Sequence, residues 1–257
     1  MAYNNSVMKK FLLTLFVVLF SYVIGQNKSI VVEYNYFPGQ YEEEASNNYL
    51  FLNENHNIFF LYGTAGTELK FENIENDFKK SRIGSIIDHI SDNKLLFTGY
   101  MTGSKRYLTE DNLPKIIWSL KNESKEILGY KCYKAEGTFR GRNWIAWYSP
   151  QIASQLGPWK IGGLPGLVLE AYTDKDEYKY TARRILTNSN LTVPQGIIDY
   201  INEKKGSIIP FKEYIEKENE FIQSLSSEQL SSMPTGTTLV KQPLRNAQIE
   251  SIFEWEY

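Results

Sequence analysis

The chain has 257 residues, of which 42% are hydrophobic and 14% aromatic, and its 28 basic and 30 acidic side chains give a formal net charge of −2. This balance excludes the strongly basic surface with which proteins bind nucleic acid. The single cysteine, Cys132, excludes an internal disulfide, so a hydrophobic core must stabilise the fold. We expect no metal ion, because neither His56 nor His89 lies in a metal-ligand spacing, and no cofactor, because no cofactor-binding motif is complete.

The first residues have the layout of a cleavable signal peptide. Two lysines precede the apolar run Phe11–Ile24, which is shorter than the roughly 20 residues of a membrane-spanning helix, and the cut is placed after Gly25. The sequence therefore predicts a signal peptide at residues 1–25 and a single β-rich domain at residues 26–257, with no integral membrane segment in the mature chain. An uncleaved anchor is the alternative. The mature protein is expected in the periplasm or in association with the outer membrane.

Apolar and polar residues alternate with period two in several segments of the mature chain, which predicts antiparallel strands that bury one face. The predicted strands are 30–36, 50–52, 58–62, 85–90, 95–101, 115–120, 126–136, 139–148, 167–173, 178–186 and 249–257. The polar residues 53–57 and the charged residues 174–177 are typical of hairpin tips. Three-four spacing after Pro210 predicts one helix, which is followed by a Ser/Thr/Gly-rich loop at 226–238.

The segment Gly157–Leu167 holds four glycines and two prolines in eleven residues, and such a composition dictates the backbone shape. Leu164 is extended because a proline follows it, and Pro165 and Gly166 suit the two central positions of a type II turn. We interpret the segment as a turn that lets strands pack closely. A phosphate cradle with Lys160 is a weaker alternative, because a strand and not a helix follows.

The residues Gly163–Val168, with the sequence GLPGLV, resemble the signature of the GLPGLI family, a group of exported bacterial envelope proteins of unknown function. Residues 127–132, 139–142 and 147–148 also resemble that family's pattern in the same order, so the resemblance covers about residues 115–173. The family is similar to the bowl-shaped N-terminal domain of a secreted peptide-N-glycanase. The resemblance implies a mainly β fold with a strongly curved antiparallel sheet, bowl or open-barrel-like, and one or two accessory helices.

Alternation over residues 139–148 puts two arginines and two aromatic residues on one face, where guanidinium forks could bind carboxylates or phosphates and aromatic planes could stack on sugars. Exposed Trp159 and Lys160 would extend this face into a binding rim. The alternative is that the arginines pair with neighbouring glutamates or cover apolar surface with their stems. The candidate binding residues are Arg140, Arg142, Trp144, Tyr148, Trp159, Lys160, Gly163, Leu164, Pro165 and Gly166.

No complete set of catalytic residues can be identified in the sequence. We interpret Cys132 as a buried packing thiol, and His56 and His89 as surface or cross-strand residues. The leading hypothesis is a non-catalytic binding or assembly module of the cell envelope, whose partner is an envelope protein or a glycan or peptide ligand. A peptide- or glycan-directed hydrolase is the alternative, and two close, buried acids in a cleft would favour it. A small outer-membrane β-barrel is a third hypothesis, although many predicted strands carry charge on both faces.

Overall fold

The computed structural model describes residues 28–39, 46–64, 83–101, 105–231, 244–246 and 248–256. The predicted signal peptide at 1–25 and most of the predicted loop at 226–238 lie outside these residues. The described elements are β1 (Ser29–Pro38), β2 (Ser46–Leu52), β3 (Asn57–Thr64), β4 (Ile83–Ser91), β5 (Lys94–Met101), β6 (Lys105–Asn112), β7 (Ser119–Ile127), β8 (Tyr130–Phe139), β9 (Arg142–Ser149), β10 (Leu167–Thr173), β11 (Tyr178–Ser189), α3 (Gln195–Lys204), η2 (Lys205–Ser207), β12 (Ile209–Pro210) and α4 (Phe211–Ser231). Neither helix in these ranges is long and apolar enough to cross a bilayer.

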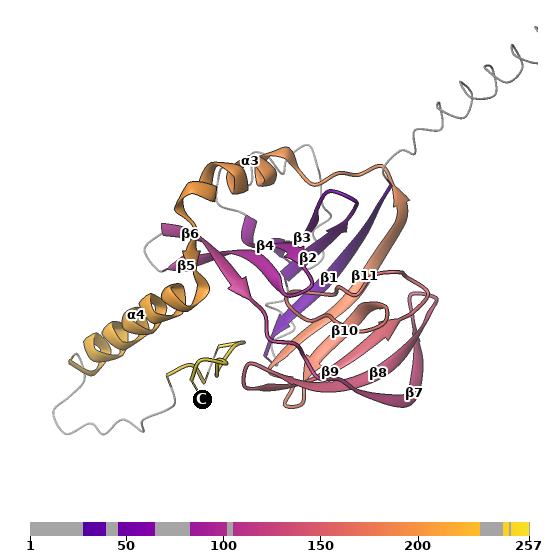
Figure 1. Cartoon of the computed structure of the whole chain (residues 1–257). Coiled ribbons are helices and arrows are strands. Elements are labelled where there is room, and N and C mark those ends of the chain that lie inside the picture. The colour runs from indigo at the N-terminus through magenta and orange to yellow at the C-terminus, as the bar shows by residue number, and fades with distance from the viewer. Residues whose placement is uncertain are drawn as a thin grey trace, which may run out of the picture.

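All the described strands form one sheet in the order β12-β6-β5-β4-β3-β2-β1-β11-β10-β9-β8-β7. Neighbours pair antiparallel except for the short parallel contact of β12 with β6. β1 pairs with both β2 and β11 and so joins an N-terminal meander to a C-terminal one (Figure 1). The sheet does not close, because β7 and β12 remain at its two edges. The prediction of a mainly β fold is confirmed.

The sheet is strongly curved, as a single ion pair demonstrates. Asp111 lies in β6, near one edge of the sheet, and Arg140 directly follows β8, near the other edge. Nine strand spacings of about 4.8 Å would put these strands about 40 Å apart in a flat sheet. The guanidinium of Arg140 is instead 2.7 Å from the carboxylate of Asp111. The sheet therefore bends into an open bowl whose far strands meet.

Both faces of the central strands are covered, so the core has two parts. In β1, Val32 and Tyr34 pack on the side of the long β9–β10 connection, whereas Val31 packs on the side of α3. α3 contributes Ile197 and Ile201 to the second part and lies across β2 and β3 (Figure 1). A third cluster joins α4 to the C-terminal residues. Two covered faces explain why successive residues of these strands are buried.

Several predicted elements have different limits in the structure. The prediction of strands at 115–120 and 126–136 is wrong in its limits, because residues 113–118 are irregular and a turn at Leu128–Gly129 separates β7 from β8. The strand predicted at 139–148 is interrupted by a second turn at Arg140–Gly141. Both residues of each turn have positive φ, between 43° and 82°, as two-residue hairpins of type I′ require.

The other differences between prediction and structure concern elements whose apolar residues show little or no regular spacing, or a spacing that suggests the wrong element. β6 was not predicted, because two of its inward residues, Thr109 and Asp111, are polar and no apolar period is visible. α3 was not predicted, since it buries only Ile197 and Ile201. The strand predicted at 249–257 is wrong, because the described residues there are irregular. α4 confirms the helix predicted after Pro210 and extends into the predicted loop, to Ser231.

The β9–β10 loop, residues 150–166, contains the glycine-rich segment. The amide of Gly166 donates to the carbonyl of Leu164 at 2.8 Å, which is a γ-turn centred on Pro165 and not the predicted type II turn. A Cβ at Gly166 would lie 2.3 Å from the carbonyl oxygen of Ser149. The glycine is therefore required because two backbone segments touch at the start of β10.

We expect Gly166→Ala to destabilise the protein by at least about 2 kcal/mol, because the new methyl group would meet backbone atoms that cannot move aside. Gly206→Ala is the matched control, since a Cβ at Gly206 meets nothing within 4 Å. Urea unfolding of both variants measures the difference. Equal midpoints for the two variants would contradict this account of the loop.

Candidate functional site

Five charged residues form an ion cluster where the two ends of the sheet meet: Asp111, Arg140, Lys160, Glu250 and Glu254. Arg140 donates through Nη1 and Nη2 to both carboxylate oxygens of Asp111, at 2.8 and 2.7 Å, and through Nη1 to Glu250 at 2.6 Å. It also reaches Glu254, through Nε at 3.1 Å and Nη2 at 2.8 Å. The cluster therefore ties the β8–β9 turn to β6 and to the C-terminal segment.

Lys160 brings the β9–β10 loop into the same cluster. Its Nζ donates to Asp111 at 2.7 Å and to both oxygens of Glu250 at 3.0 Å, and the residue is only 2% exposed. The ring of Phe211 lies 4.0 Å from this ammonium group and 5.1 Å from the guanidinium of Arg140. The two cations are thus held between carboxylates and aromatic faces, away from water.

Asp111 is ionised within this cluster. Burial alone would raise the pKa of Asp111, but Lys160 and Arg140 hold that pKa below its ordinary value. A carboxylate held in this way has no proton to donate near neutral pH. Asp111 and Glu250 are close and buried, but the cations they share make them a structural pair and not the acid pair of a hydrolase.

The predicted binding face differs from the structure. The expectation that Trp159 and Lys160 are exposed is wrong, because both are buried. Arg142 is also buried and donates to Glu177 and to the carbonyl groups of residues 246 and 248. The alternative that the arginines pair with glutamates is what the structure shows. Trp144 and Tyr148 are buried within the core.

The four remaining predicted residues follow Lys160 in the loop. Leu164 and Gly166 are buried, whereas Gly163 and Pro165 are exposed. Gly163 and Lys160 line a cavity, so they are the predicted residues that the structure brings to the site described next. A ligand role for any of the ten residues stays a prediction.

Two adjoining cavities form a groove between the β9–β10 loop and the ends of β1 to β4, and we name it the His89 groove. The first cavity, of about 520 Å³, is lined by Lys28, Ile30, Leu52, Asn53, Glu54, Asn57, His89, Ile90, Ser91, Asp92, Ala153, Ser154, Gln155 and Leu156. The second, of about 450 Å³, is lined by His89, Asp92, Asn93, Leu113, Pro114, Lys115, Ile116, Gln155, Leu156, Lys160, Gly162 and Gly163. Four residues line both, so the cavities are continuous along the loop.

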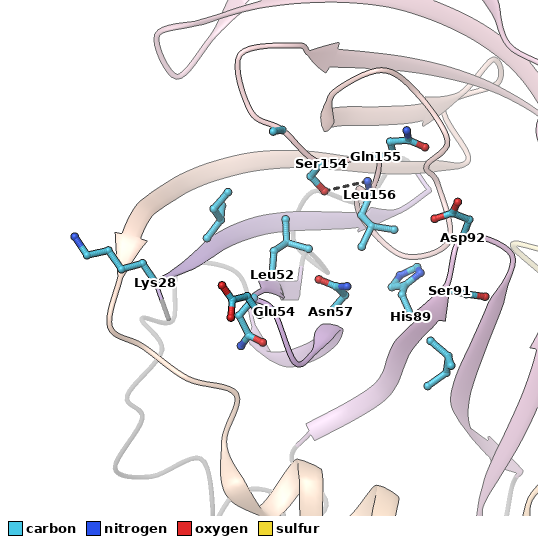
Figure 2. Close-up of a pocket in the computed structure, with 14 residues that line it drawn as sticks. Lys28, Leu52, Glu54, Asn57, His89, Ser91, Asp92, Ser154, Gln155 and Leu156 are labelled. Carbon is cyan, nitrogen blue, oxygen red and sulfur yellow. Dashed lines mark hydrogen bonds between the residues drawn. The ribbon is translucent and has the colours of Figure 1, made fainter. Parts of the chain in front are cut away.

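The wall of the groove is fixed by hydrogen bonds within the loop and to a neighbouring segment. The amide of Gly163 donates to the carbonyl of Gln155 at 2.7 Å, and the indole of Trp118 donates to the carbonyl of Gly162 at 2.9 Å. Leu156 projects from this wall toward Asn57 and His89, and Gln155 lies next to it in the loop (Figure 2). These hydrogen bonds therefore hold the wall of the groove in place, and both loop side chains line the first cavity.

His89 lies at the junction of the two cavities. Burial lowers the pKa of its imidazole to about 4, and the charge of Lys160 adds to this effect, against a hydrogen bond to the backbone of Trp159 that raises the pKa. Its Nε2 has no hydrogen-bond partner among the described residues and is shielded from solvent. The ring is thus neutral near pH 7. The sequence predicted a surface or cross-strand residue, and His89 does lie across from Leu95 in β5.

Three further kinds of reactive group bear on the chemistry of the site: the cysteine thiol, clusters of metal ligands and the carboxylates of the groove. Cys132 is buried, as predicted, and burial raises the pKa of its thiol to about 11. Within the described ranges, no group of three or more His, Cys, Asp or Glu residues is placed to hold a metal ion. The carboxylates of the groove, Glu54 and Asp92, are both exposed.

The fold and the groove define an open β-bowl with a groove along one loop, and comparison with known proteins gives the family. A family model described as "N-glycanase peptide, N-terminal domain" matches residues 40–204. The chain belongs to this family. No curated protein matches the chain.

The solved structures that are similar to the chain include the following two. The one described as "Structure of PNGF-II in C2 space group" is 19% identical with a TM-score of 0.50, and covers 75% of this chain and 33% of its own. The one described as "Structure of PNGF-II in P21 space group" is 18% identical with a TM-score of 0.48, and covers 75% of this chain and 34% of its own. The chain thus spans about a third of these proteins. At 19% sequence identity, the similarity to the first of these structures shows only that the fold is shared.

We expect Lys160→Met to reduce the free energy of unfolding by about 3–5 kcal/mol, because Asp111 and Glu250 would lose a shared cation inside the protein. Lys94→Met is the matched control, since the pair of Lys94 with Glu110 is exposed to solvent. Chemical denaturation at pH 7 compares the two. A loss no larger than that of the control would show that the cluster does not stabilise the fold.

We expect the imidazole of His89 to titrate with a pKa of about 4, which NMR of the ring protons can follow. The folded pKa lies below the unfolded value of about 6.5, so the unfolded chain binds the proton first, and the wild type loses stability as the pH falls from about 6.5 to 4. His89→Asn removes this loss, which is about 2 kcal/mol between pH 7 and pH 4.5. The same pH dependence in both proteins would refute the shift.

Proposed function

We propose that the chain is a glycan-directed module of a glycan-hydrolysing system and that it binds glycosylated polypeptide along the His89 groove. The observation that carries the proposal is the family match, which covers residues 40–204 and therefore includes all four residues shared by the two cavities: His89, Asp92, Gln155 and Leu156. Of the functions expected from the sequence, this match supports the alternative, a peptide- or glycan-directed hydrolase, better than the leading hypothesis of a non-catalytic binding or assembly module.

The groove has the chemistry that such a ligand needs. Its lining combines apolar side chains with amides, hydroxyl groups, one imidazole and exposed backbone, which together offer both donors and acceptors. Each cavity has the volume typical of a small-molecule or oligomer site. A sugar hydroxyl or a peptide group could therefore be bound without moving the sheet.

The hydrolytic step is not assigned to the described residues. Asp111 and Glu250 are held by Arg140 and Lys160, and these ion pairs suit them to holding the loop in place. The role proposed for this chain is to hold the substrate, while cleavage depends on groups outside the ion cluster. Such a division is consistent with a chain that spans about a third of the solved proteins it resembles.

The proposed location follows from the sequence. The predicted signal peptide at residues 1–25 and the resemblance of residues 163–168 to the GLPGLI family both support export. We propose that the module works in the periplasm or in association with the outer membrane, where glycosylated polypeptides or other envelope proteins are its partners.

The test is binding of an asparagine-linked glycopeptide, measured by isothermal titration calorimetry. We expect Asn57→Ala and Gln155→Ala each to weaken binding roughly 3- to 10-fold, because each removes hydrogen-bonding groups that face the groove. Gln195→Ala is the matched control, since this exposed amide lies on α3 and bonds to Asp199. No binding by the wild type, or equal affinity for all four proteins, would overturn the proposal.

A further inference from the structure

The described lining of the His89 groove contains no Trp, Tyr or Phe. The chain has 18 Tyr, 14 Phe and 5 Trp residues, so aromatic side chains are plentiful. Many of them are buried in the core, such as Trp144, Trp159 and Phe253. Sugars commonly pack on aromatic planes, and the groove offers none. The groove is therefore poorly suited to grip the glycan itself.

The groove does offer the groups that recognise polypeptide. Aliphatic side chains line both cavities: Ile30, Leu52, Ile90, Leu113, Ile116 and Leu156. Three amide side chains, Asn53, Asn57 and Gln155, lie among those of the first cavity. A side-chain amide has one acceptor and two donor hydrogens, which match the N–H and C=O groups of an extended peptide. Alternate side chains of such a peptide would enter the aliphatic parts of the lining.

We propose that the His89 groove binds the polypeptide part of a glycosylated substrate, as an extended and uncharged segment with aliphatic side chains. This inference rests on the proposed function and specifies what the groove recognises. The exposed side chain of Ile90, 52% accessible at the end of β4, is the apolar surface that the segment covers. The sugar remains outside the groove.

The charges around the groove favour an uncharged segment. The exposed charged residues that line it are two lysines, Lys28 and Lys115, and two acids, Glu54 and Asp92. The fifth charged residue, Lys160, is already neutralised by Asp111 and Glu250. The balance gives no net field to attract an acidic or a basic peptide.

His89 supplies an acceptor of the kind that a peptide N–H requires. The imidazole is bonded to the backbone of Trp159 and its Nε2 is left without a partner among the described residues, at the point where the two cavities join. Figure 2 shows the ring beside Leu156, which covers it from the loop side. A shift of the Leu156 side chain on binding would let a peptide N–H donate to Nε2.

Calorimetry with the full chain and three probes tests the inference. The probes are an end-blocked peptide of eight residues with alternating Val or Leu and Asn or Thr, the same peptide with an oligosaccharide on one Asn, and the free oligosaccharide. We expect the peptide and the glycopeptide to bind with Kd values within about threefold of each other, and the free oligosaccharide to bind at least tenfold more weakly.

The outcomes separate this inference from the proposed function. Equal binding of the glycopeptide and the free oligosaccharide, with no binding of the bare peptide, would overturn the inference and leave the proposed function standing. Binding of the bare peptide alone would support the inference and overturn the proposed function. Failure of all three probes to bind would overturn both.

A matched pair of variants locates the site. Ile90→Asp places a charge on the aliphatic lining, and we expect at least tenfold weaker binding of the bare peptide. Ile117→Asp is the control, because Ile117 is 77% exposed and does not line either cavity of the groove. Both are surface substitutions, so circular dichroism should show folded proteins. Equal affinities of the two variants would place the peptide elsewhere and overturn the inference.

Discussion

The contact of Arg140 and Lys160 with Asp111 and Glu250 is the interaction on which the shape of the molecule depends. It joins β6, the β8–β9 turn, the β9–β10 loop and the C-terminal segment, which come from four separate parts of the sequence. Burying these charges costs free energy, and it is tolerated because every charge has several partners of opposite sign. In return, an open sheet is held curved without closing into a barrel, and the loop that forms one wall of the groove is fixed in place.

The groove depends on this arrangement indirectly. Lys160 is in the ion cluster, and the next loop residues, through Gly163, return to bond with Gln155, so the cluster and the groove wall are parts of one loop. Part of the glycine and proline content that makes the loop conspicuous in the sequence serves close backbone contacts, as at Gly166. The residues that face the groove form no recognisable sequence motif, and only the fold brings them together from separate segments.

Most of the sheet could be predicted from the sequence, because β1 carries apolar residues at every second position and β3 and β10 contain short apolar runs bounded by polar residues. The pattern failed at Arg140–Gly141, where alternation continues through a hairpin turn, and in β6, where buried residues are polar. The site could not be predicted in the same way. The carboxylates that neutralise Arg140 lie 29 to 114 residues away, and the groove combines several distant strand ends and loops. The residues around His89 gave no local signal that it lines the groove.

The position of β1 has a consequence for how the chain acquires its structure. The first described strand, β1, pairs with β11, and Ser29 lies opposite Ser189. The pairing of β1 with β11 at the centre of the sheet therefore cannot form until most of the polypeptide has been synthesised. Pairing over such a separation is slow, because the entropy of a long loop is lost before contacts compensate for it. The sheet is therefore incomplete while the chain is being synthesised. A polypeptide in that incompletely folded state can still be threaded across a membrane.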